Sequence, residues 1–160
     1  MGTFRPRLLE APTAGPRMDA LCDFIEFWLG PRQPSCGESA QALSECPLPM
    51  PLRRLYEFAG RWPRRANQRE IGHEVPAFSH QDSLVTFHRL SRDEGGKVVF
   101  LQENQRVWNC RTLPDGEDPP VWCHGDLIDL RGGYSSGEKL VCESLSRFLT
   151  TFVLQEIAFG

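Results

Sequence analysis

The chain has 160 residues, of which 40% are hydrophobic and 24% charged, a balance typical of one globular domain and not of a disordered segment. Its net charge of −3 argues against a dedicated nucleic-acid-binding protein, which usually carries a clear positive excess. The first residues do not resemble a secretory signal, and no stretch approaches the 18 or so apolar residues of a membrane span, so we expect a cytoplasmic protein without membrane contact. The six cysteines are then expected to be free thiols that behave as small apolar groups.

The N-terminal third predicts a loose arm and two helices. Residues 1–17 contain three prolines and little periodicity, which indicates an arm, and residues 18–160 are expected to form a single domain. Apolar residues at three- and four-residue steps predict a helix over Met18–Leu29, with an inner face formed by Leu21, Cys22, Phe24, Ile25, Trp28 and Leu29. After a loop, a second helix should begin near Pro51 and end at Gly60, which supplies a left-handed stop, with an inner face of Leu52, Leu55, Tyr56 and Ala59.

The second half of the chain predicts strands and a closing helix. Short β-branched and aromatic runs indicate strands over Leu84–Leu90, Lys97–Leu101 and Arg106–Cys110, and an edge strand over Pro120–Cys123, since proline cannot sit in a sheet centre. The glycine-rich segment Gly132–Leu140 is expected to be a surface turn. An apolar stripe predicts a last helix capped by Ser144, on the residues Leu145, Phe148, Leu149, Phe152, Val153 and Ile157. The predicted class is α+β, with an antiparallel sheet of about four to six strands packed by N-terminal helices and a closing C-terminal helix.

The search for catalytic chemistry is negative. No Gly-x-Ser-x-Gly motif is present, and Gly132–Leu140 has Glu138 where a phosphate-binding loop needs lysine. Cys123, His124 and Asp126 are residue types that bind zinc, but neighbours on a strand point to opposite faces, so Cys123 and His124 cannot easily bind one ion. We therefore predict no catalytic residue, no metal and no cofactor. A metal-dependent enzyme with a site at these residues is the least favoured alternative.

Charge is distributed unevenly along the chain. Six arginines and one acid, Glu57, lie between Arg53 and Arg69. The segment from Leu113 to Leu130 instead has five acids and no lysine or arginine: Asp115, Glu117, Asp118, Asp126 and Asp129. The two patches either neutralise each other across the fold or form a charged face for a charged partner. The arginine cluster has few interleaved aromatic residues apart from Trp62, which disfavours direct nucleic-acid binding.

Several soft motifs then occur in a characteristic order. A proline-initiated helix in LPMPLRRLYEFAGRWP is followed by a hairpin with E-N-Q and a tryptophan, by a D-P-P-V segment, and by a closing S-L-x-x-F-L helix. This order, over about residues 48–160, resembles the SUKH superfamily, which is named for a fungal cell-wall-synthesis regulator of the Smi/Knr type and for bacterial immunity proteins.

The resemblance implies an α+β domain that binds another protein and has no catalytic residues. Most bacterial members look like immunity proteins that block a toxin domain, often a nuclease or deaminase. We therefore expect a non-catalytic module that neutralises a basic toxin domain through an acidic face, formed by Asp115, Glu117, Asp118, Trp122, Asp126 and Asp129. Trp122 either anchors the partner or closes the sheet's hydrophobic face. The alternative within the same family is an intracellular regulatory or scaffold protein.

Overall fold

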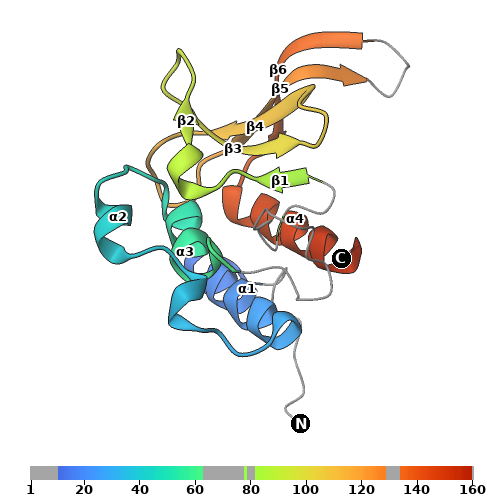
Figure 1. Ribbon diagram of the computed structural model, residues 1–160. Helices are drawn as coiled ribbons and strands as arrows, with labels where there is room; N and C mark the ends of the chain where they lie inside the picture. The colour runs from blue at the N-terminus through green and yellow to red at the C-terminus, as the bar shows by residue number, and fades with distance from the viewer. Residues whose placement is uncertain (1–10, 63–77, 79–81, 129–133, 160) are drawn as a thin grey trace.

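The computed structural model describes residues 11–62, 78, 82–128 and 134–159, with the backbone alone at 126–128, 134–136 and 159. It confirms the α+β class (Figure 1). The helices are α1 Ala14–Leu29, α2 Ala40–Ser44, α3 Met50–Ala59 and α4 Leu145–Phe159, with 3₁₀ turns at Pro34–Cys36 and Phe87–Arg89. The strands are β1 Asp82–Leu84, β2 Ser91–Arg92, β3 Val98–Glu103, β4 Trp108–Thr112, β5 Val121–Ile128 and β6 Tyr134–Cys142.

The strands form one antiparallel sheet in the order β1-β3-β4-β5-β6, and β2 pairs with β3 next to β1. Helices α1, α3 and α4 contact one another and lie on one side of this sheet (Figure 1). Burial alternates along β5, where Val121 and Cys123 are buried and Trp122 and His124 are only half-buried. Because side chains alternate along a strand, Val121 and Cys123 face the helices, and Trp122 and His124 lie on the outer face.

The core lies between the inner sheet face and the three helices. Its largest fully buried side chains come from all parts of the chain: Met18, Leu21, Ile25, Leu52, Leu55, Tyr56, Phe78, Phe100, Leu101, Leu145, Leu149 and Val98. Tyr56 donates a hydrogen bond from its hydroxyl to the carbonyl oxygen of Val85 at 2.5 Å, which satisfies the one polar group that this ring takes into the core. Burial raises the pKa of Tyr56, so the phenol stays protonated.

The first helix begins earlier than its pattern predicts. It starts at Ala14 and not at Met18, and Ala14 and Arg17 are both buried. The predicted arm over residues 1–17 is therefore wrong at its C-terminal end, because Arg17 finds a buried partner that periodicity does not show. Trp28 was predicted on the inner face but is 48% exposed.

The second predicted helix is confirmed as α3, with Pro51 in its first turn and the predicted inner face buried. The predicted role of Gly60 is wrong, because its φ of −61° and ψ of −17° are those of right-handed helix. Glycine is needed there for space: a Cβ atom would lie 2.7 Å from the carbonyl oxygen of Tyr56 and 2.9 Å from its ring.

Three predictions about the strands need correction. The region predicted as one strand, Leu84–Leu90, contains the end of β1 and the 3₁₀ turn that precedes β2. The predicted edge strand at Pro120–Cys123 is the start of β5, which lies inside the sheet between β4 and β6. Proline does not interfere because both prolines precede the first paired residue, Val121. The predicted turn at Gly132–Leu140 contains most of β6, the strand at the sheet's edge.

A pair of glycines marks the point where β5 and β6 leave the rest of the sheet. Gly125 pairs with Gly137 on β6 and with Trp108, the first residue of β4. Beyond this pair the two strands continue together to the Ile128–Tyr134 pair as a ribbon that extends past β4 (Figure 1). Both glycines have positive φ, +135° and +134°. A Cβ on Gly125 would collide with the carbonyl oxygen of Val107 and lie 2.7 Å from the Cα of Trp108, whereas one on Gly137 would meet nothing within 4 Å.

This difference predicts unequal effects of the same substitution. Gly137→Ala should lower the free energy of unfolding by about 1–2 kcal/mol, from backbone strain alone. Gly125→Ala should lower it by about 3 kcal/mol or more, because β4 must also move away from the added methyl group. Urea unfolding of both variants measures the difference, and equal losses would contradict the close approach of β4 to Gly125.

Candidate partner-binding surface

The loop of residues 113–120 joins β4 to β5 where two helices begin. The backbone N–H of Met50, the first residue of α3, donates to the carbonyl oxygen of Gly116 at 3.1 Å. The N–H of Leu145, the first residue of α4, donates to the carbonyl oxygen of Pro119 at 2.9 Å. The acids of this loop therefore lie near two helix N-termini, whose partial positive charge favours them. Asp115 and Glu117 are exposed, and neither makes an ion pair among the described residues.

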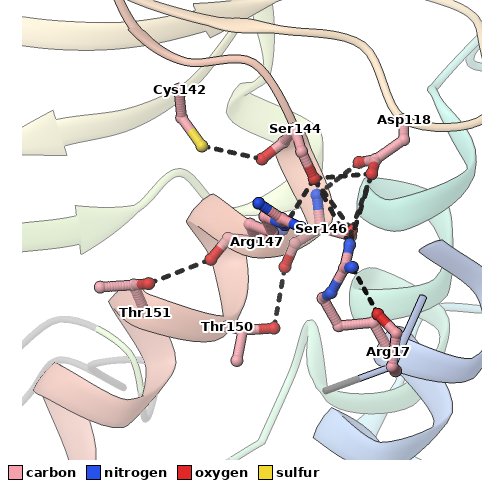
Figure 2. Close-up of polar contacts among 9 residues, drawn as sticks. Arg17, Asp118, Cys142, Ser144, Ser146, Arg147, Thr150 and Thr151 are labelled. Atoms are coloured by element: carbon pink, nitrogen blue, oxygen red, sulfur yellow. Dashed lines mark hydrogen bonds and ion pairs between the residues drawn. The ribbon is translucent and has the colours of Figure 1, made fainter. Parts of the chain in front are cut away.

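Asp118 differs from its neighbours because its carboxylate is used inside the fold. Its Oδ1 accepts a hydrogen bond from the backbone N–H of Ser146 at 2.7 Å. Its Oδ2 accepts from the hydroxyls of Ser144 at 2.6 Å and Ser146 at 2.9 Å. The same oxygen lies 3.5 Å from Nη1 of Arg17, which is almost fully buried (Figure 2). Asp118 is therefore a structural residue that caps α4, while 23% of its side chain remains exposed, so its predicted contact with a partner stays a prediction.

Arg17 completes this network from the first helix. Its Nη1 donates to the hydroxyl of Ser146 at 2.5 Å, and its Nη2 donates to the carbonyl oxygen of Ala11 at 2.6 Å (Figure 2). Ser144 accepts from the N–H of Arg147 at 3.2 Å, which confirms its predicted role as the N-cap of α4. The network thus joins α1, the 113–120 loop and α4. Sequence reasoning missed Arg17 and Ser146, because they are 129 positions apart and no local pattern connects them.

Trp122 lies on the outer face of the sheet, opposite Arg111 on β4 and Leu140 on β6. The ammonium group of Lys97 lies 4.6 Å from the centre of its ring, in a cation–π contact. Lys97 also makes an ion pair of 2.5 Å with Glu138 on β6. These contacts fix the ring of Trp122 in place, and 53% of Leu140 beside it is exposed.

A second set of polar contacts holds the same face. Arg111 makes an ion pair with Asp93 at 2.9 Å, and its Nε donates to Oδ1 of Asn109 at 2.8 Å. Asp93 also accepts from the backbone N–H of Lys97 at 2.9 Å. We use the term Trp122 face for the outer sheet surface made of Lys97, Asn109, Arg111, Trp122, His124, Glu138 and Leu140. Lys97 is paired with Glu138, and Arg111 with the neighbouring Asp93, so together these residues offer a partner a rigid surface with little net charge.

The predicted acidic residues whose backbone is described lie in two separate places. Asp115 and Glu117 lie at the loop end of β5, whereas Asp126 lies five residues into the strand, on the ribbon beyond the glycine pair. At about 3.3 Å per residue, the backbone of Asp126 is roughly 17 Å from the start of β5. The side chain of Asp126 and all of Asp129 lie outside the described residues, so their part of the prediction stays a prediction.

The arginine cluster forms ion pairs with acids outside the acidic segment Leu113–Leu130. Arg54 pairs with Asp19 on α1 at 3.1 Å and with Glu57 on α3 at 3.6 Å. Within the described ranges no ion pair joins this cluster to the acidic loop, although the Met50–Gly116 hydrogen bond brings the loop next to α3. Trp62, the aromatic residue noted in the cluster, is buried and so is not exposed for stacking.

The remaining candidates for chemistry lie on opposite sides of the sheet. Cys123 faces the core and His124 the outer surface, as predicted from their adjacency, and Cys110 lies directly opposite Cys123. All six cysteines are free thiols in this structure. Where the structure describes side chains, no three His, Cys, Asp or Glu residues are grouped to hold a metal ion. The described part of the chain also has no helix with the length and apolar character needed to cross a membrane.

Comparison with known proteins leaves the family assignment open. No protein-family model matches the chain, and neither a curated protein nor a solved structure was found to be similar to it. The SUKH resemblance therefore depends on the order of its sequence motifs alone.

The Asp118 network predicts a large difference between two neighbouring acids. Asp118→Ala should lower the free energy of unfolding by about 3 kcal/mol or more, because it leaves the buried Arg17 without its counter-charge and removes a cap from α4. Asp115→Ala, the exposed control from the same loop, should change it by no more than about 0.5 kcal/mol. Thermal or urea unfolding of both variants measures this, and similar effects of the two would contradict the structural role of Asp118.

The contacts of Asp93 predict that the stability of the fold depends on pH. Burial raises the pKa of Asp93, but hydrogen bonds from the Lys97 N–H and from Arg111 outweigh it, so the pKa lies below the ordinary value of a carboxyl group. The unfolded chain therefore binds this proton more readily than the folded one, and the stability contributed by ionised Asp93 is complete above about pH 4 and lost as pH falls through the lowered pKa. Near neutral pH, the free energy of unfolding of the wild type should exceed that of Asp93→Asn by up to about 1 kcal/mol. This difference should disappear in acid. Urea unfolding at several pH values measures this difference in stability. A difference that does not change with pH, or the same difference in the control variant Glu94→Gln, would contradict this role.

Proposed function

We propose that the chain is a non-catalytic, SUKH-like protein-binding module that acts as an immunity protein: it binds a basic toxin domain and blocks it. The observation that supports this most is the division of roles within the acidic loop. Asp118 has a buried counter-charge, whereas Asp115 and Glu117 are exposed and have no ion-pair partner within the described ranges. The nearby helix N-termini favour these charges only modestly, so a partner of opposite charge would give them a further role.

The neighbouring part of the Trp122 face supplies the apolar part of the proposed interface. Trp122 is the second residue of β5 and so lies next to the acidic loop, and Leu113 and Leu140 are exposed near it. Tryptophan is common among the residues that contribute most to binding, and a polar rim around such a residue is typical of interfaces. Because Lys97 and Glu138 already hold this region, little order has to be created when a partner docks.

A basic partner follows from the chemistry of the toxins that such proteins block. A nuclease must attract a polyanionic substrate and is therefore usually basic. Exposed acids would speed its encounter with the immunity protein and favour it over neutral surfaces. The proposed inhibitor thus competes for the charged surface that the toxin uses for its substrate.

The test is co-expression with the toxin encoded by the neighbouring gene, with cell survival and the dissociation constant of the purified pair as readouts. The Asp115→Asn/Glu117→Gln variant should bind roughly tenfold more weakly, and Trp122→Ala about 30-fold or more. The control, Asp23→Asn/Glu26→Gln, removes the same charge from exposed positions of α1 outside the proposed interface and should protect like wild type.

Full protection by the loop double variant, at equal expression, would show that the acidic loop is not the interface. Recovery of several unrelated partners in a pull-down, with no toxin among them, would instead favour the regulatory or scaffold alternative. Asp118 is left unchanged in this test, because its loss would weaken binding through unfolding.

A further inference from the structure

Two of the six cysteines face each other across neighbouring strands. Cys110 on β4 and Cys123 on β5 are direct partners in the sheet register, and only 2% and 4% of them is exposed. The other four cysteines are distributed over α1, the first 3₁₀ turn, the segment after α2 and the end of β6, where Cys142 pairs with Val121. All six lie in described residues, and the sheet register brings together this one pair.

The register places the two cysteines within reach of a covalent bond. Directly opposed residues of antiparallel strands have Cα atoms about 4.5–5.5 Å apart, inside the range of about 4.4–6.8 Å that disulfides span. Both side chains point to the inner face of the sheet, and they are close enough for one thiol to donate a hydrogen bond to the other. The register alone therefore brings the two cysteines into the range of a disulfide.

The hydrogen bond makes the two thiols chemically unequal. Cys110 acts as the donor, and this bond together with burial raises the pKa of Cys110. Cys123 acts as the acceptor, and the bond from Cys110 lowers the pKa of Cys123 despite burial. Since the thiolate is the reactive form, the lowered pKa of Cys123 favours Cys123 as the first nucleophile, and Cys110 would then resolve its oxidised product.

We propose that Cys110 and Cys123 are a redox pair that closes into an intramolecular disulfide when the protein meets a peroxide. The Cys123 thiolate attacks one peroxide oxygen and breaks the O–O bond, which gives a sulfenic acid and releases hydroxide. Cys110 then attacks the Cys123 sulfur, the S–O bond breaks, and the oxygen leaves as water. In total two thiols lose two electrons and two protons, and one hydrogen peroxide becomes two waters.

The bond would be reversible and would act on the strand that presents Trp122. Opposed Cβ atoms in a sheet are about 4.5–5.5 Å apart, which is at or beyond the 3.5–4.5 Å typical of disulfides. The disulfide would therefore be strained and easily reduced. While closed it would join β4 to β5 on the side opposite the Trp122 face and restrict the 113–120 loop between them. This inference does not depend on the proposed toxin partner.

Peptide mapping of the oxidised full-length chain tests it. Trypsin should release Cys110 in the peptide Val107–Arg111 and Cys123 in the peptide Thr112–Arg131, so the disulfide would join two peptides that otherwise separate. After hydrogen peroxide treatment and thiol blocking with N-ethylmaleimide in denaturant, the intact chain should carry four labels where the reduced chain carries six. Dithiothreitol should restore the six.

Cys142→Ser is the matched control, because it removes a half-buried thiol from the next strand and should leave the linked peptides unchanged. Cys110→Ser should abolish the linked peptides and leave a sulfenic acid on Cys123 that dimedone traps. Six labels after oxidation of the wild type, or peptides linked through any other cysteines, would overturn the proposal. The label count and the linked peptides are measured on the wild-type chain, so they test the proposal even if a serine variant fails to fold.

Discussion

The contact between Arg17 and Asp118 is the interaction on which the arrangement of this domain depends. A guanidinium that is almost fully buried must be paired, because an isolated buried charge costs several kcal/mol. Arg17 comes from the first helix, Asp118 from the loop between β4 and β5, and the serines they share from the start of the last helix. One network therefore sets where three distant segments meet. It also fixes the place at which β5, with Trp122 as its second residue, enters the sheet.

Because of this network, neighbouring acids of the 113–120 loop have different roles, one in the fold and two in the proposed binding of a partner. Asp115, Glu117 and Asp118 look alike in the sequence, yet one carboxylate is taken up by the fold and the other two remain exposed. Charged side chains of the outer sheet face are also used within the fold. Lys97 pairs with Glu138 and Arg111 with Asp93, and Lys97 contacts the ring of Trp122. What remains for a partner is a rigid surface with two acids at one end, Asp115 and Glu117, which make no ion pair among the described residues. For this reason we favour a protein that binds a basic domain over one with chemistry of its own.

Periodicity was enough to predict α3 and most of α1 and α4, because the spacing of buried side chains in a helix is written locally in the sequence. It failed where long-range pairing decides the structure. The glycines and serines of Gly132–Leu140 suggested a turn, but the positive φ of Gly137 is tolerated inside a paired strand, opposite another glycine. The proline pair before Val121 suggested an edge strand, although both prolines lie outside the pairing. The role of Asp118 depends on partners 28 and 101 positions away, and no local rule could reveal it.

A double-mutant cycle between Arg17→Met and Asp118→Asn tests the central claim most directly, because it measures the energy of their contact apart from the effect of each side chain on its other neighbours. The free energies of unfolding of the wild type, the two single variants and the double variant are compared. We expect the double variant to lose less stability than the sum of the single losses, by about 1–3 kcal/mol. Losses that add within about 0.3 kcal/mol would show that the two residues act independently and would contradict the account.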